Sequence, residues 1–167
     1  MSQMKSAVDQ IRTARLYTKD LLSHIAESDW FREPAEGVTH VAWQVGHLPV
    51  AQYSLTLKRI RGEKPGDDEL LPADFRKLFG KGSVPEADPG KYPSIADIRQ
   101  VLDRVHQQAL DELSALPESV LDEPSIDPPH PMFNTKLGAL NWCAQHEFIH
   151  AGQIALLRRL FGAAPLR

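Results

Sequence analysis

Two histidines and a glutamate lie close together near the end of the chain, in the pentapeptide HEFIH at residues 146–150. The pattern H-E-x-x-H is typical of zinc peptidases, in which both histidines bind the metal and the glutamate is the general base. On a helix, residues four apart share one face, so His146 and His150 can present both imidazoles to one ion. Imidazole suits zinc, nickel, copper or iron. A metal site is therefore the first hypothesis for this segment.

The sequence that follows argues against a peptidase. Such enzymes usually take a third ligand from downstream, but the residues after His150, AGQIALLRRLFGAAPLR, contain no His, Asp or Glu. The longer pattern H-E-x-x-H-x-x-G-x-x-H is broken, because Gln153 stands at the glycine position and Leu156 at the third histidine. Glu147 is rotated by about 100° from His146 on an ideal helix, so it can face solvent as easily as metal. The third ligand is then expected from upstream.

His47 is the best upstream candidate for the third ligand. It shares a predicted helical stripe with Trp43, Val50 and Leu57, which is mostly apolar, so its side chain should point inward. The alternative is a core histidine bonded to a backbone carbonyl, for example one freed by Pro49, and spacing alone leaves the two readings even. The other candidates are several carboxylates and the remaining histidines His24, His40, His106 and His130. Of these, we expect His40 at the rim of the site or behind its ligands, and His130 on the surface or at the mouth of the site.

Polar residues interrupt the side of the last predicted helix that should face the core. The residues of this stripe are Ala139, Cys143, His146, His150, Gln153, Leu157 and Leu160. Buried polar groups need partners, so these residues call for an explanation. Gln153 is the favoured residue for orienting a nucleophile or fixing a histidine tautomer, with Glu147, Gln44 and Asn141 as alternatives. An amide that bonds a neighbouring helix is the other reading of Gln153.

Three further residues near the predicted site have two readings each. Cys143 is either a fourth ligand or a small core residue, and the core is favoured because an added thiolate would tend to close an open site. Trp43 and Trp142 either wall a substrate pocket or fill the core, the commoner outcome for tryptophan.

The apolar spacing predicts long helices over residues 5–28, 39–61, 94–116 and 135–161. Thr39 is the expected N-cap of the second helix, and Ser94 with Asp97 resembles a capping box at the start of the third. Pro49 removes a backbone donor and should kink or split the second helix near residues 45–47. The fourth helix should end at Gly162.

These elements predict an all-α protein, a four-helix bundle that forms one domain over residues 1–167 with long connections. Residues 62–93 are rich in Gly, Pro and Asp, and PADFRKLFG within them predicts a short extra helix. A connection of this length usually serves as a lid or a packed cover. Residues 117–134 contain several prolines and should be irregular.

The composition is that of an ordinary globular protein of 167 residues. The net charge of −3 argues against a nucleic-acid binder held by a general positive field. The single cysteine excludes an internal disulfide and, with no signal-like N-terminal stretch, makes the cytoplasm the expected location. No apolar run approaches the roughly 18 residues that span a bilayer, so no membrane contact is expected.

Two stretches, THVAWQVGHL at residues 39–48 and HEFIHAGQI at residues 146–154, resemble the DinB-like superfamily of metalloenzymes. The first is similar to the W-x-x-G-H motif of that family and the second to its H-x-x-x-H-x-G-Q motif. The resemblance implies a four-helix bundle with one divalent ion, zinc or nickel, held by His47, His146 and His150. It also implies open coordination sites and homodimers. Characterised relatives include transferases and isomerases that activate the sulfur of a low-molecular-weight thiol.

The resulting expectation is a metal-dependent enzyme, a thiol-dependent S-transferase or isomerase that acts on a small electrophilic molecule. Gln153 and Glu147 are its predicted catalytic residues, beside the three histidines. A metal-dependent hydrolase is the nearest alternative. The others are a non-catalytic, stress-related bundle that binds metal, and a metal-free helical interaction module. Closed structural zinc sites normally have four protein ligands, so three histidines favour an open site and therefore chemistry.

Overall fold

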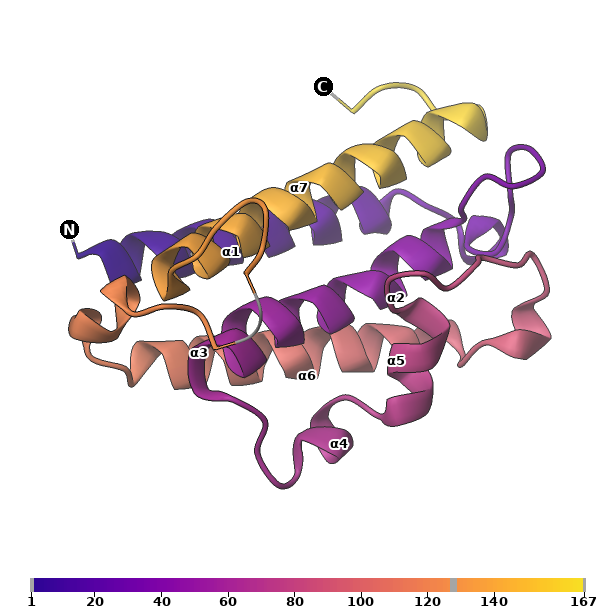
Figure 1. Cartoon of the computed structure of the whole chain (residues 1–167). Coiled ribbons are helices and arrows are strands. Elements are labelled where there is room, and N and C mark those ends of the chain that lie inside the picture. The colour runs from indigo at the N-terminus through magenta and orange to yellow at the C-terminus, as the bar shows by residue number, and fades with distance from the viewer. Residues whose placement is uncertain (1, 127–128, 167) are drawn as a thin grey trace.

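The structure is a computed structural model that describes residues 2–126 and 129–166, and its regular elements are helices (Figure 1). The prediction of an all-α protein is confirmed for these residues, which contain no strand. Four helices are long, and they are α1 (Gln3–Ser23), α2 (Val41–Gln52), α6 (Ile95–Ser114) and α7 (Lys136–Leu160). The second of them continues through a π-helical segment, Tyr53–Lys58, into α3 (Arg59–Arg61). The short helices α4 (Asp67–Leu70) and α5 (Ala73–Phe79) lie in the long connection.

The starts of the last two long helices agree with the sequence. The Oγ of Ser94 accepts a hydrogen bond from the N–H of Asp97 at 3.1 Å, and Thr135 caps α7 in the same way. The second helix begins one residue later than expected. Its cap is His40 rather than Thr39, because Nδ1 of His40 accepts from the N–H of Trp43 at 3.1 Å. The first helix ends at Ser23, earlier than predicted, and a short 3₁₀ turn follows it at residues 27–29.

Pro49 does not break the second helix where the sequence predicted. Helix α2 runs unbroken through residues 45–47 and past Pro49, which is buried. Packing against α6 and α7 holds the helix across the proline, since tertiary contacts commonly override local propensity. The irregularity lies later instead, in the π-helical segment Tyr53–Lys58.

The long helices lie as two neighbouring pairs, α1 beside α7 and α2 beside α6 (Figure 1). Contacts between α2 and α7 and between α1 and α6 join the pairs, and the buried apolar side chains among these helices form two clusters. One cluster includes Val45, Leu102 and Ile154, which are essentially inaccessible to solvent. The interior faces of α2 and α7 therefore meet along the length on which the predicted metal ligands stand.

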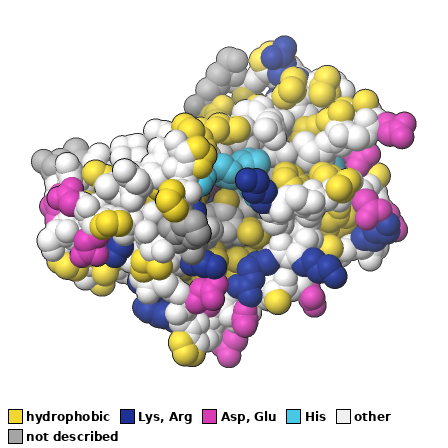
Figure 2. All heavy atoms as spheres, viewed as in Figure 1, with side chains coloured by type: hydrophobic (Ala, Val, Ile, Leu, Met, Phe, Trp, Pro, Cys, Tyr) yellow, Lys and Arg dark blue, Asp and Glu magenta, His cyan; other side chains and the backbone are white. Residues whose placement is uncertain are grey.

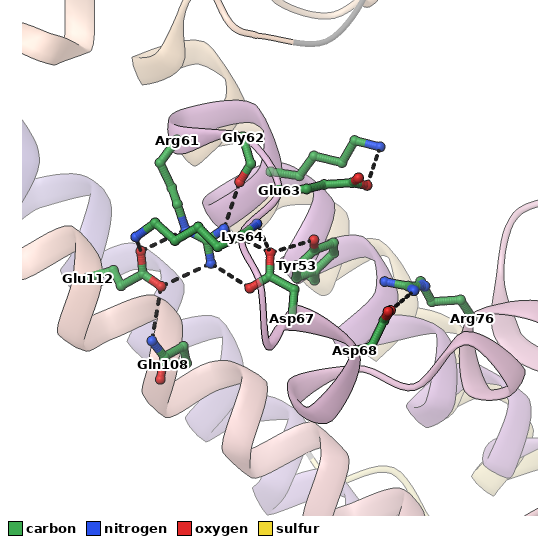
Figure 3. Close-up of polar contacts among 11 residues, drawn as sticks. Tyr53, Arg61, Gly62, Glu63, Lys64, Asp67, Asp68, Arg76, Gln108 and Glu112 are labelled. Carbon is green, nitrogen blue, oxygen red and sulfur yellow. Dashed lines mark hydrogen bonds and ion pairs between the residues drawn. The ribbon is translucent and has the colours of Figure 1, made fainter.

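The connection between α3 and α6 packs against α2 and is fastened at its start by charged groups (Figure 3). The Arg61 guanidinium donates to both oxygens of Asp67, at 2.9 Å each, and to both oxygens of Glu112 on α6. Tyr53 also donates to Asp67 at 2.9 Å. We call Arg61, Asp67 and Glu112 the clasp. It ties residues 62–93 to the helices on either side, so that α5 reaches the flank of α2.

The predicted short helix of this connection is confirmed as α5, whereas α4 was not predicted. The irregular character of residues 117–134 also agrees with the described part of that segment, which contains a 3₁₀ turn at Glu118–Asp122 and residues of two isolated β-bridges. Among the described residues, no helix is both long enough and apolar enough to cross a membrane.

Candidate metal centre

Three histidines converge between α2 and α7. His47 comes from α2, and His146 and His150 come from successive turns of α7. One ring nitrogen from each lies within 4.8 Å of the other two. Across residues 2–126 and 129–166 this is the group of His, Cys, Asp or Glu side chains whose geometry could hold a metal ion. The structure thus brings together the three residues that the sequence motifs singled out.

The spacing of the nitrogens fits a first-row metal ion. The Nε2 atoms of His146 and His150 are 3.3 Å apart. Two nitrogens bound to one tetrahedral zinc at about 2.0–2.1 Å are separated by roughly 3.4 Å. The imidazole rings of His47 and His150 have centroids 4.8 Å apart, and those of His47 and His146 are 5.3 Å apart. The donor set and its dimensions therefore suit a divalent first-row metal ion.

The orientation of His47 is fixed by the long connection. Its Nδ1 donates to the backbone carbonyl of Phe79, the last residue of α5, at 2.7 Å. A carbonyl can only accept, so the proton sits on Nδ1 and the Nε2 lone pair is free for a metal. Gly46 makes this approach possible, because a Cβ at residue 46 would overlap the ring of Phe79. The glycine of the W-x-x-G-H motif is thus explained by close packing of α5 on α2.

Gln44 fixes the orientation of His150. Its Oε1 lies 2.5 Å from Nδ1 of His150, and its Nε2 donates to Oγ1 of Thr39 at 3.1 Å. The amide nitrogen is thereby committed to Thr39, so its oxygen accepts from His150. Gln44 itself is buried. Two of the three histidines therefore have Nδ1 engaged and Nε2 available, the usual arrangement behind a metal-binding imidazole.

All three imidazoles are held in the neutral form that binds metals. Burial, together with the nearby His47 and His130, lowers the pKa of His146 to about 4. Burial, together with His146 and His47, lowers the pKa of His150 to about 3. Burial also lowers the pKa of His47, partly offset by its bond to Phe79. A metal ion would therefore not have to displace protons from these rings at neutral pH.

A cavity of about 670 Å³ opens beside the three histidines. His47 and His146 form part of its lining, and Trp43 and Trp142 stand in its walls. Trp43 stacks on the ring of His47 at 5.0 Å between centroids, and its Nε1 donates to Ser83 of the long connection. Figure 2 shows the histidines at the floor of a hollow bordered by hydrophobic side chains. Of the two readings of these tryptophans, the structure supports the pocket wall.

The two predicted catalytic residues lie elsewhere. Gln153 is exposed, so its expected place on the core-facing stripe is wrong. The buried face of α7 follows Glu147, Ala151 and Ile154 instead, which turns residue 153 to the solvent side. Glu147 is buried, and its two oxygens accept from Nε and Nη2 of Arg15 on α1 at 2.7 and 3.2 Å. The carboxylate of Glu147 is therefore held in an ion pair. The general base of a peptidase needs a carboxylate that is free to accept a proton.

Cys143 and the other histidines lie outside the group formed by His47, His146 and His150. Cys143 is buried among apolar side chains, where burial and the charge of Glu147 raise the pKa of its thiol, as expected for a core cysteine. His40 is the buried cap of α2, and His106 contacts Gln52 at 3.0 Å. His24 is an exposed neighbour of Asp20. His130 lines the cavity and stacks on Phe133, so it lies at the mouth of the site.

Three important residues were missed or undervalued in the sequence. Arg15 gave no signal, because an arginine on the first helix reads as a surface residue until its buried partner on α7 is known. The contribution of Phe79 is a backbone carbonyl, which no side-chain pattern reveals. Gln44 was one of several candidates for orienting a histidine, and its place one turn before His47, facing α7, is the signal that favours it.

Comparisons with known proteins identify the family of this chain. A search of functionally curated proteins gives no significant match. Among solved structures, the chain is similar to the crystal structure of a conserved protein from Enterococcus faecalis. The TM-score is 0.63 at 16% identity, over 96% of this chain and 97% of that chain, a likeness that shows the fold alone. The sequence model of the DinB superfamily matches residues 10–154, a range that includes all three histidines. The chain therefore belongs to the DinB superfamily.

Proposed function

We propose that this protein is a metal-dependent enzyme whose single divalent ion, zinc or nickel, is held by His47, His146 and His150 within a four-helix bundle. The observation that carries the proposal is the convergence of three neutral imidazoles, within 4.8 Å of one another, beside a cavity rather than inside a closed core. A fourth protein ligand is lacking among the described residues, since Cys143 and Glu147 have other surroundings. Such a donor set leaves coordination positions for a small molecule.

A divalent ion held by these three histidines would lower the pKa of a bound thiol or water and so supply a nucleophile near neutral pH. The protein's own groups fix the geometry. Phe79 and Gln44 hold the rings of His47 and His150 so that Nε2 points to the same place. Trp43 and Trp142 supply flat apolar walls against which a small electrophilic substrate can be oriented.

We favour a low-molecular-weight thiol over water as the group that is activated, in an S-transferase or isomerase reaction. The support is the character of the cavity, whose walls include Val50, Ala51 and Leu55 in addition to the tryptophans. A volume of about 670 Å³ is enough for both a thiol and a second small molecule. We place this reaction in the cytoplasm, as expected from the single cysteine.

Metal content tests the ligand assignment. Purified protein should contain about one zinc or nickel ion per chain, and His47→Ala and His150→Ala should each lose it. His24→Ala is the matched control, because His24 is exposed and lies outside the group. Metal that remains bound in His47→Ala would overturn the assignment.

A second experiment tests the thiol chemistry. Cobalt-loaded protein should gain a sulfur-to-cobalt charge-transfer absorption on addition of a small thiol, and absence of this absorption would overturn the thiol chemistry.

We also propose that a second copy of the chain covers the outer face of α1 and α7. Three large apolar side chains on these two neighbouring helices are exposed to solvent. They are Leu16 of α1 and Phe148 and Ile149 of α7. Tyr17 and Phe148, with ring centroids 6.0 Å apart, join the two helices there. Light scattering should give the mass of a dimer, and Phe148→Glu with Ile149→Glu should give a monomer that still binds metal.

A further inference from the structure

His130 is a polar residue of the cavity lining that the function proposed above leaves without a role. It lines the same cavity as His47 and His146, and its side chain is half-buried. Its Nδ1 accepts a hydrogen bond from the backbone N–H of Met132 at 3.2 Å. Among the described residues, none is hydrogen-bonded to its Nε2. One nitrogen of the ring is thus engaged by the protein, and the other is available to a ligand.

The bond to Met132 decides which nitrogen carries the proton. A backbone N–H can only donate, so Nδ1 uses its lone pair, and the proton of the neutral ring sits on Nε2. Burial, and then the positive charges of Arg59 and Lys81, lower the pKa of His130, which favours the neutral ring at pH 7. His130 therefore presents an N–H donor at the mouth of the cavity.

Aromatic neighbours hold this donor in place. The ring of His130 stacks on Phe133, with centroids 4.4 Å apart and planes 15° apart, and Phe133 is itself buried. The centroid of Trp142 lies 6.1 Å from that of His130 and 6.3 Å from that of His146, so the tryptophan stands near both histidines. A donor that is oriented before the substrate binds needs little reorganisation during a reaction.

Other polar side chains of the lining are less suited to this role. Ser83 is engaged on both sides, because its Oγ accepts from Nε1 of Trp43 and donates to a backbone carbonyl at 2.8 Å. Lys81 is exposed. The hydroxyl of Ser54 and the indole N–H of Trp142 are the rival donors in the cavity walls. Variants of these two residues therefore belong in the test.

We propose that His130 is a catalytic residue whose Nε2–H donates a hydrogen bond to an oxygen of the electrophile that gains negative charge as the sulfur of the thiol attacks. The proposal rests on the function proposed above and adds a substrate class, an oxygen-bearing electrophile such as an epoxide. The C–S bond forms, the C–O bond breaks, and its electron pair stays on oxygen, beside Nε2–H. The proton that the thiol releases reaches this oxygen through water, so His130 is neutral before and after the reaction.

Two electrophiles that differ in the atom gaining charge test this role. Metal-loaded protein with mercaptoethanol is given propylene oxide, whose oxygen becomes negative, or propyl iodide, which releases iodide. His130→Phe should lower the ratio of kcat/KM for the epoxide to kcat/KM for the iodide by about 100-fold, the loss expected for one oriented donor. His130→Gln keeps an N–H donor and should recover part of the ratio. The ratio cancels effects on metal content and thiol binding, which a merely structural role would change for both electrophiles.

His24→Phe is the matched control, because His24 is exposed and lies outside the cavity, and it should keep the wild-type ratio. Ser54→Ala and Trp142→Phe test the rival donors. An unchanged ratio in His130→Phe would overturn the proposal. A loss of the ratio in either rival variant, with none in His130→Phe, would overturn it as well and assign the donor to that residue.

A binding measurement separates this proposal from the thiol chemistry. Nitrogen NMR of zinc-loaded protein should show a protonated Nε2 and an unprotonated Nδ1 for His130. Tetrahydrofuran, an unreactive ether with an acceptor oxygen, should shift the Nε2 resonance. A protonated Nδ1, or an Nε2 resonance that the ether does not move, would overturn the role of His130 even if the thiol chemistry is correct. A shift without turnover of either electrophile would contradict the thiol chemistry and support the donor site.

Discussion

The ring of His47 and the backbone carbonyl of Phe79 are joined by a 2.7 Å hydrogen bond, so the long connection helps to orient a proposed metal ligand on α2. The connection is thus part of the proposed metal centre as well as a wall of the adjacent cavity. Its approach depends on Gly46, which has no Cβ to collide with the ring of Phe79. Changes in this contact should therefore alter metal binding without altering any ligand.

Gly46→Ala should weaken metal binding by about 10–100-fold, the range found when groups behind metal ligands are disturbed. The added methyl group would push Phe79 away and release Nδ1 of His47. Competition with a chelator measures the affinity. Gly152→Ala is the matched control, because Gly152 lies in α7 with open space around it, and this change should leave affinity unchanged. Equal affinities in the two variants would contradict the role of Gly46.

Gln44→Ala should also lower metal affinity by about 10–100-fold, because His150 would lose the acceptor that holds its proton on Nδ1. Gln153→Ala should have no effect, since Gln153 is exposed. The same chelator competition compares the two glutamine variants. A larger loss in Gln153→Ala than in Gln44→Ala would restore the role that the sequence predicted for Gln153.

Breaking the buried pair of Arg15 and Glu147 should reduce the free energy of unfolding by about 3–5 kcal/mol, because one charge would remain buried without its partner. Glu147→Ala measured by urea unfolding tests this. The double variant Arg15→Met with Glu147→Leu should recover much of the loss, since it removes both charges. Full stability in Glu147→Ala would show that the pair is not what holds these helices together.

The clasp should keep the long connection, residues 62–93, in a fixed conformation. Asp67→Asn removes a charge that Arg61 contacts through two nitrogens, so residues 62–93 should become more sensitive to limited proteolysis. Asp68→Asn is the control, because its contact with Arg76 is at the surface and Asp68 is 80% exposed. Identical cleavage rates in the two variants would argue against the clasp.

Acid should destabilise the metal-free protein through His106. Burial, with the charge of Arg15, lowers the pKa of His106 to about 3 in the folded state, against about 6.5 in the unfolded chain. The unfolded state therefore binds a proton first, and stability is lost as pH falls from about 6.5 towards 3. Urea unfolding at pH 7 and pH 4.5 should show a loss to which His106 contributes about 2–3 kcal/mol. His106→Gln should lessen this loss, and an unchanged slope would exclude His106 as its source.

The sequence was informative where the signal is local. The cap at Ser94 and the i, i+4 pair His146 and His150 are set by residues a turn apart, and these agree with the structure. Gln153 was misplaced because heptad-like spacing identifies a face of a helix only to within a residue, and the buried face of α7 runs through Glu147 and Ile154 instead. The bond from His47 to Phe79 depends on how a distant segment packs, which spacing does not encode.

The π-helical segment Tyr53–Lys58 sets the rotational phase of everything that follows it on the second helix. On a regular α-helix, the spacing between His47 and Arg59 corresponds to an offset of about 120° around the axis. A π-helical turn takes up one additional residue, which removes about 100° of rotation and leaves an offset of about 20°. Arg59 is thereby aligned with His47 on the cavity side. Deleting one residue from this segment would restore a regular α-helix and keep Arg59 on the cavity side, because eleven residues at about 100° each also give an offset of about 20°.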